Sequence, residues 1–137
     1  MSFEAIVSVI ADERTVRTAR RDYRATVLEL LQAVGYAPTM EHVSRLRAID
    51  REEAAVVVER CIRLDLANGL PCIEVHAAED LAARLMDCFD AGTTFLTNAT
   101  WDGERLSSWT DVSRATFDSG IIAIGNVSAI VWFEDED

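Results

Sequence analysis

The sequence lacks several features that mark common classes of protein. Among its 137 residues there is no lysine, and there are only two histidines and three cysteines. No apolar run approaches the roughly 20 residues that a membrane-spanning helix needs. The start of the chain has no basic segment, and Glu4 interrupts its first apolar residues, so we expect no secretory signal peptide. These absences predict a cytoplasmic protein.

The cysteines and histidines form no recognisable metal or catalytic motif. Cys61, Cys72 and Cys88 do not have the C-x-x-C spacing of metal or redox sites, so we expect reduced and mostly buried thiols. No phosphate loop, dinucleotide fingerprint or nucleophile elbow is present. The acidic end of the chain, residues 134–137, contains oxygen ligands suited to Ca²⁺ or Mg²⁺, but no glycine-centred loop shapes it. We therefore expect no metal site and no cofactor.

What the sequence does contain is a helical half followed by a strand-rich half. Apolar residues at steps of three and four predict helices over residues 2–34, with a break after Ile10 as an alternative, and over 39–48, 50–68 and 77–91. Asp50 is expected to cap the third of these helices. Residues 72–76 alternate like a short strand. The sequence thus assigns residues 1–91 mainly to helices.

The last third of the chain is rich in β-branched and aromatic residues separated by turn residues. Strands are expected over residues 93–100, 106–112, 116–124 and 128–134, with a hairpin turn at Asp102-Gly103. The run 128–134 is apolar enough for a central strand buried on both faces. Gly120, inside a strand, suggests a bulge or a close approach of two backbones. We predict a single α+β domain, 1–137, in which a mainly helical half, 1–91, packs on a β-meander half, 92–137, that supplies a mostly antiparallel sheet of four or five strands.

Charge is the most informative global property. The formal net charge is −11, and residues 66–137 hold thirteen acids against three arginines. Such a field repels nucleic acid and anionic membranes and attracts a basic partner. Four arginines, Arg17, Arg20, Arg21 and Arg24, lie at helical spacing on one face. In so acidic a chain we expect that face to pair with the acidic half or with a second copy rather than with nucleic acid.

Tryptophans and carboxylates are interleaved in the last third, and this mixture predicts a surface for a basic protein. Trp132 is expected in the core. The predicted partner-binding residues are Trp101, Asp102, Glu104, Trp109, Asp111 and Asp118. The leading hypothesis is a small acidic protein that occludes a basic partner, as an immunity or inhibitor protein does to a bacterial toxin domain.

Two alternatives remain open from the sequence. One is a homo-oligomeric structural or accessory protein assembled through the arginine-rich N-terminal helix. The other is a small enzyme, since Glu74 and His76 would lie on one face of the predicted strand as an acid–base pair. His42 has no second ligand one turn away and is expected to be solvent-facing or hydrogen-bonded.

Overall fold

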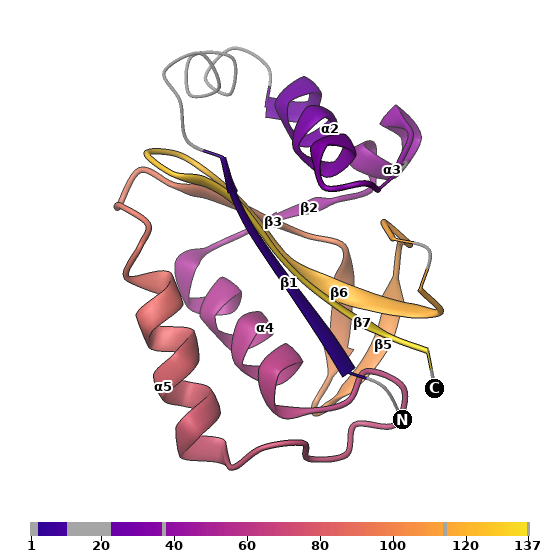
Figure 1. Cartoon of the computed structure of the whole chain (residues 1–137), viewed down its shortest axis with the longest axis vertical. Helices are drawn as coiled ribbons and strands as arrows, with labels where there is room; N and C mark the ends of the chain where they lie inside the picture. The colour runs from indigo at the N-terminus through magenta and orange to yellow at the C-terminus, as the bar shows by residue number, and fades with distance from the viewer. Residues whose placement is uncertain (1–2, 11–22, 37, 114, 137) are drawn as a thin grey trace.

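The computed structural model describes residues 3–10, 23–36, 38–113 and 115–136. Seven strands and four helices lie within this part of the chain (Figure 1). In chain order they are β1 Phe3–Ile10, α2 Tyr23–Ala33, α3 Met40–Ser44, β2 Arg47–Ile49, α4 Arg51–Arg63, α5 Val75–Met86, β3 Thr94–Thr97, β4 Ala99–Asp102, β5 Arg105–Trp109, β6 Phe117–Ile124 and β7 Ser128–Asp135.

A five-stranded antiparallel sheet forms the centre of the molecule. Its strand order is β1-β7-β6-β3-β2, and β4 with β5 makes a separate two-stranded sheet. The β4–β5 hairpin is inserted between β3 and β6, which pair with each other directly. Helices α2 and α3 lie on one face of the large sheet, and α4 lies on the other with α5 beside it (Figure 1).

The alternation of side chains along β6 and β7 supplies both faces of the sheet with apolar residues. Ile121, Ala123, Val131 and Phe133 pack with α4 and α5 in one buried cluster. Their neighbours along the strands form the second cluster, with α2 and α3; these are Ile122, Ile124, Ile130 and Trp132. Strand β7 is thus buried on both faces, as the run of apolar residues predicts for a central strand.

Several sequence predictions are confirmed. The chain has the α+β class, with its described helices between residues 23 and 86 and an antiparallel sheet built mainly from the last third. Asp50 caps α4, accepting a hydrogen bond from the Glu53 N–H at 2.7 Å. The turn at Asp102-Gly103 joins β4 to β5, with Gly103 at φ +60°. Trp132 is fully buried.

Four assignments are wrong. Residues 93–100 are not one strand of a meander but divide into β3 and β4, which belong to different sheets. Phe3–Ile10 is a strand rather than a helix, and it pairs along its whole length with β7. Residues 72–76 are not a strand, because α5 already begins at Val75. The predicted helix 39–48 ends at Ser44, and Arg47–Ile49 forms an edge strand against β3. The helices therefore do not precede all strands but are interspersed with β1 and β2.

The cysteines only partly follow expectation. All three are free, but Cys72 and Cys88 are exposed and only Cys61 is buried. Burial raises the pKa of the Cys61 thiol to about 12, so it remains protonated and packs as a small apolar side chain.

Candidate functional site

The tip of the β4–β5 hairpin presents two of the predicted partner-binding carboxylates. Asp102 and Glu104 flank Gly103 and are both exposed. Glu104 accepts an ion pair from Arg63 at 3.1 Å, and the Glu104 side chain stays 62% exposed. Within the described part of the chain, Asp102 makes no ion pair. The tip is therefore a charged projection, as the sequence predicts.

The two tryptophans of the hairpin are less available than predicted. Trp101 is half-buried, packs against the core beneath α4, and its indole N–H has no partner among the described residues. Trp109 donates its indole N–H to Asp111 at 2.9 Å, and its ring lies 5.3 Å from that of Phe117. Asp111 follows the opposite end of β5 from the tip, beside a shallow pocket. The predicted residues therefore do not form one patch.

Asp118 is not a surface residue, which corrects its assignment to the partner-binding surface. Its side chain is fully buried and accepts hydrogen bonds from the backbone N–H groups of Val112 and Ser113 and from the Asn98 amide. Burial raises the pKa of this carboxyl, and the bonds from Ser113 and Val112 oppose the rise. Asp118 thus holds the segment after β5 in place from inside the fold.

Glu74 and His76 do not form the predicted acid–base pair. Glu74 caps α5, and its carboxylate accepts the backbone N–H groups of His76 at 2.9 Å and Ala77 at 3.0 Å. These bonds lower the pKa of Glu74. The His76 ring is exposed and lies 3.9 Å from Glu79. A carboxylate committed to a helix cap beside a solvent-exposed imidazole lacks the enclosed geometry of an acid–base site.

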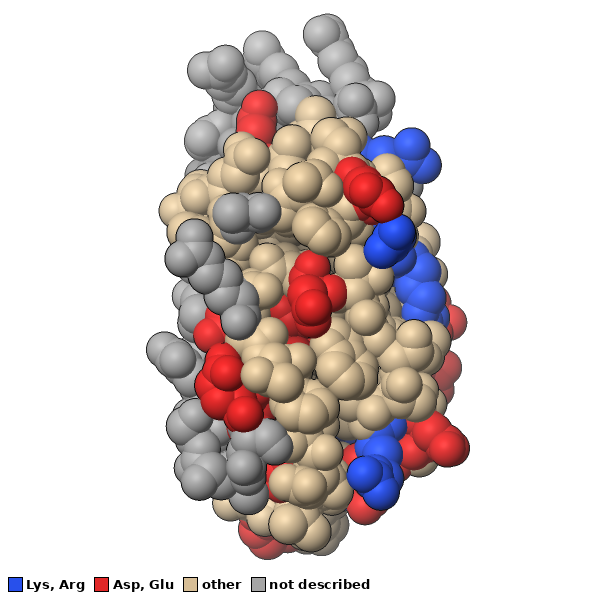
Figure 2. Space-filling model, turned by 90° about the vertical axis from the view of Figure 1, so that its right-hand side faces the viewer, with Lys and Arg blue, Asp and Glu red and all other residues tan. Residues whose placement is uncertain are grey.

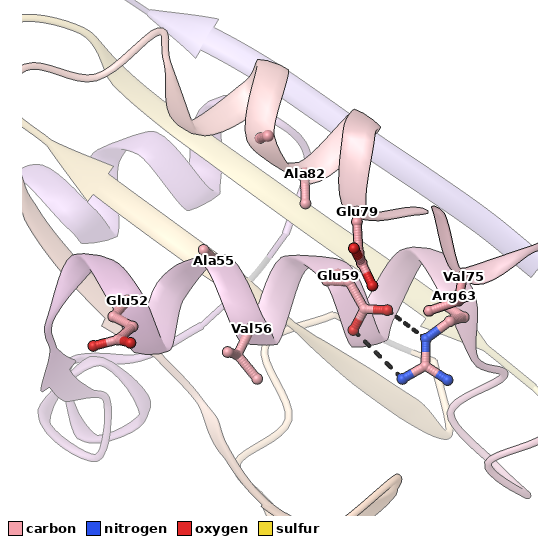
Figure 3. Close-up of a pocket in the computed structure, with 9 residues that line it drawn as sticks. Glu52, Ala55, Val56, Glu59, Arg63, Val75, Glu79 and Ala82 are labelled. Atoms are coloured by element: carbon pink, nitrogen blue, oxygen red, sulfur yellow. Dashed lines mark hydrogen bonds and ion pairs between the residues drawn. The ribbon is translucent and has the colours of Figure 1, made fainter. Parts of the chain in front are cut away.

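A groove of about 440 Å³ lies between α4 and α5 (Figure 3). We call it the α4–α5 groove, and its lining is largely apolar with charged residues at intervals along it. The lining residues are Glu52, Ala55, Val56, Glu59, Arg63, Val75, Glu79, Ala82 and Ala83. Val56 and Val75 are each 40% exposed, which is unusual for β-branched side chains on helices that also cover a core.

Helical spacing explains how each helix contributes one wall. On α4, Glu52, Val56, Glu59 and Arg63 follow one another at intervals of four, three and four, so they share one face. The core-facing residues Ala54, Val57, Val58 and Cys61 occupy another face of the same helix. On α5 the groove residues again recur at steps of three and four, namely Val75, Glu79, Ala82 and Ala83.

Hydrogen bonds join α4 to the end of α5 at one end of the groove and join α4 to the hairpin at the other. At the start of α4, Arg51 donates to the carbonyl oxygens of Met86, the last residue of α5, at 3.0 Å and of Phe89, three residues further on, at 2.8 Å. At the end of α4, Arg63 pairs with Glu59 and with Glu104 of the hairpin tip. Helix α4 is thus fixed to the end of α5 at one end of the groove and to the hairpin tip at the other.

The electrostatic character of this surface is acidic. Glu52, Glu59 and Glu79 line the groove, and Glu104, which pairs with Arg63, lies beside its end. Among the described residues, Arg63 is the one basic side chain that lines the groove, and its hydrogen bond to Glu59 raises its pKa. Figure 3 shows the Glu79 carboxylate reaching from α5 toward Glu59. Because Arg63 already pairs with Glu59, the groove carboxylates that pair with no arginine among the described residues are Glu52 and Glu79.

The acidic field extends beyond the groove. On the side of the molecule at the right of Figure 1, acidic residues are scattered from top to bottom among mostly uncharged residues, while the basic residues follow one edge (Figure 2). Arg24 is exposed on α2, whereas Arg17, Arg20 and Arg21 lie outside the described residues. The described structure therefore combines dispersed acidic residues with a narrower groove that is partly apolar.

Within the described ranges, no group of three or more His, Cys, Asp or Glu side chains is placed to hold a metal ion. Of the acidic end, Asp135 is buried, Glu136 accepts a hydrogen bond from Thr116 at 3.1 Å, and Asp137 is not described. No described helix is both long and apolar enough to cross a membrane. No protein-family model, curated protein or solved structure matches the chain.

Sequence reasoning missed the groove, although one signal for it was visible. Val56 lies outside the stripe formed by Ala54, Val57, Val58 and Cys61, so a helix buried only along that stripe would leave it exposed. An apolar residue off the buried face, flanked by Glu52 and Glu59 one turn away on either side, is the pattern that marks this surface.

Proposed function

We propose that the chain is a small acidic binding protein that occludes a basic protein partner, as an inhibitor or an immunity protein against a bacterial toxin domain does. The observation that carries this proposal is the α4–α5 groove, where exposed Val56 and Val75 lie among the carboxylates of Glu52, Glu59 and Glu79. The hairpin-tip carboxylates, Asp102 and Glu104, extend the same surface.

The two kinds of residue have different tasks in such a complex. The net charge of −11 accelerates encounter with a basic protein and orients it, an effect that salt screens. The valines lose water when the partner arrives and supply affinity, since desolvated apolar contacts at the centre of an interface carry most binding energy. A rigid groove also loses little conformational entropy on binding.

The cytoplasm is the compartment that suits this function. Cys72 and Cys88 are exposed thiols, and a reducing environment keeps such thiols from forming disulfides between molecules. Assembly of a homo-oligomer through the arginine-rich segment remains a prediction, because Arg17, Arg20 and Arg21 lie outside the described residues.

A pull-down from host lysate tests the proposal. Tagged wild-type chain should retain a basic protein at low salt and release it at high salt, whereas a variant carrying Glu52→Gln, Glu79→Gln, Asp102→Asn and Glu104→Gln should retain much less. Glu29→Gln, a charge change on α2 across the sheet, is the control and should retain as much as wild type. If the amount of basic protein retained changes neither with salt nor with the four substitutions, the proposal is contradicted.

A further inference from the structure

The α4–α5 groove has a shape that selects one kind of partner segment. It lies between two helices, and Ala55, Ala82 and Ala83 keep its lining shallow enough for a third helix to approach. Along α4 the groove residues run from Glu52 to Arg63, which corresponds to about 17 Å, or three turns of helix. An amphipathic helix laid into an apolar groove is a recurrent mode of protein recognition.

The charges of the groove define the polar edges of that helix. Glu52 and Glu59 are seven residues apart on α4, so their Cα atoms are separated by about 10.5 Å along the helix axis. Val56 lies between them, and Glu79 lies on the facing wall. Because Glu59 is already paired with Arg63, the groove carboxylates open to a ligand are Glu52 and Glu79, and Glu79 reaches across the groove toward Glu59 (Figure 3). A ligand helix that places a cation opposite each of Glu52 and Glu79 therefore spans about the same two turns, and it repeats its basic residues every seven positions, with apolar residues three and four positions after each.

The charges of the groove also argue against other kinds of ligand. A nucleic acid or an anionic membrane is repelled by a surface with carboxylates on both walls. A purely apolar helix would leave Glu52 and Glu79 facing it without compensation, and burying unpaired carboxylates is costly. A basic amphipathic helix satisfies both the valines and the carboxylates.

We infer that the α4–α5 groove is the receptor for a basic amphipathic helix of about three turns in the partner protein, with arginine or lysine at seven-residue intervals beside an apolar stripe. This inference rests on the proposed function and adds to it the class of segment recognised. Arg63 closes the groove at one end, where Glu59 and Glu104 neutralise it. The ligand helix therefore ends before Arg63 or passes it with an uncharged or acidic residue.

Synthetic peptides test the inference without knowledge of the partner. The probe is a labelled peptide of about fifteen residues with Arg at every seventh position and Leu at the third and fourth positions after each Arg. Two matched probes replace either all Arg by Glu or all Leu by Ser. Fluorescence anisotropy should show binding of the first probe alone, weakened about tenfold or more between about 0.05 and 0.3 M salt.

Variants of the chain locate the binding. Val56→Ser should weaken binding of the basic amphipathic peptide by about fivefold to tenfold, as should Glu52→Gln combined with Glu79→Gln. Leu81→Ser on the same helix α5 is the apolar control, because Leu81 is 48% exposed and does not line the groove. Glu29→Gln is the charge control. Both controls should bind the peptide as wild type does.

The outcomes separate this inference from the proposed function. Loss of peptide binding in the groove variants but not in the controls supports both. A second outcome is that the wild type retains a basic protein and the Asp102→Asn, Glu104→Gln variant does not, while Val56→Ser has no effect on retention and no peptide binds. In that case the helix inference is overturned and the proposed function stands. If the all-Ser probe binds as tightly as the Leu probe, the groove is only a charged surface and the inference is again overturned.

Discussion

At the scale of single residues, Gly120 lies where the backbones of two central strands approach each other closely. A Cβ atom at Gly120 would lie 2.0 Å from the Val131 carbonyl oxygen and 3.0 Å from the Cα of Trp132. Neither backbone can move without breaking the pairing of β6 with β7. The close approach that the glycine predicts within a strand is therefore confirmed.

Gly120→Ala should lower the free energy of unfolding by about 2–4 kcal/mol, because the added methyl group forces the two strands apart. Urea denaturation monitored by tryptophan fluorescence measures the change. Gly92→Ala is the matched control, since a Cβ there meets only Asp90 Oδ1 at 3.6 Å, and it should change stability little. Equal stability of the two variants would show that β6 and β7 are not packed as described.

Asp118 provides a second test at this scale through its pH dependence. Because burial raises its pKa in the folded chain, the folded state holds the proton more tightly than the unfolded state, whose Asp pKa is about 3.9. Its contribution to stability is therefore fully present below that value and is lost as pH rises through the raised pKa.

Asp118→Asn removes the titration and turns an N–H of the new amide toward the donors of Val112 and Ser113 or toward Asn98, at a cost of about 1–3 kcal/mol. The stability advantage of wild type over Asp118→Asn should be largest near pH 4 and shrink as the pH rises, as measured by urea denaturation in a pH series. An advantage that grows with pH would mean that the fold favours the ionised carboxylate.

At the scale of elements, Arg51 joins helix α4 to the segment that follows α5. Its guanidinium donates to the carbonyl oxygens of Met86, Phe89 and Asp90 and lies 5.4 Å from the centre of the Phe95 ring. A lysine has one compact ammonium group and cannot match this planar arrangement of donors. The spacing of the groove walls depends on this contact.

Arg51→Lys should therefore cost about 1–2 kcal/mol of stability, measured as a fall in the free energy of unfolding. Arg84→Lys is the control, because Arg84 makes only an exposed ion pair with Asp80 on the surface of α5, and its substitution should fall within about 0.5 kcal/mol of wild type. An equal, small effect of both substitutions would show that Arg51 does not fix the groove.

Elements with strong local signals are predicted by the sequence, and those defined by distant contacts are not. Asp50 and the periodic apolar residues of α4 identify that helix, and the apolar run of β7 identifies a strand buried on both faces. For Phe3–Ile10, apolar spacing of three and four residues suggests a helix, while its β-branched residues suit a strand. Pairing with β7, more than a hundred residues away, decides for the strand.

In the candidate site, too, local features are predicted by the sequence and features that depend on distant contacts are not. The exposed carboxylates Asp102 and Glu104 follow from a turn dipeptide, which is local information. The groove requires α5 to pack beside α4, and no local pattern in Val75–Met86 specifies that neighbour. Asp118 was misassigned because acidity in a strand indicates exposure, whereas the buried donors of Asn98, Val112 and Ser113 come from elsewhere in the fold.

At the scale of the whole molecule, a net charge of −11 acts on stability and on binding in opposite directions. Repulsion among the carboxylates destabilises the compact state, and salt screens that repulsion. Raising NaCl from about 0.05 to about 0.5 M should raise the melting temperature by a few degrees while weakening partner binding. Calorimetry checks the first effect. A melting temperature that falls with salt would show that attractive ion pairs dominate the charge balance.

The most direct test of the central claim is to map the contact surface by nuclear magnetic resonance. The ¹⁵N-labelled chain would be titrated with the basic protein retained in the pull-down, and amide shifts recorded at low salt. We predict that the changes concentrate on the outward faces of α4 and α5 and on the tip between Asp102 and Glu104. A pull-down that retains no basic protein, or shift changes confined to α2 and α3 across the sheet, would contradict the account.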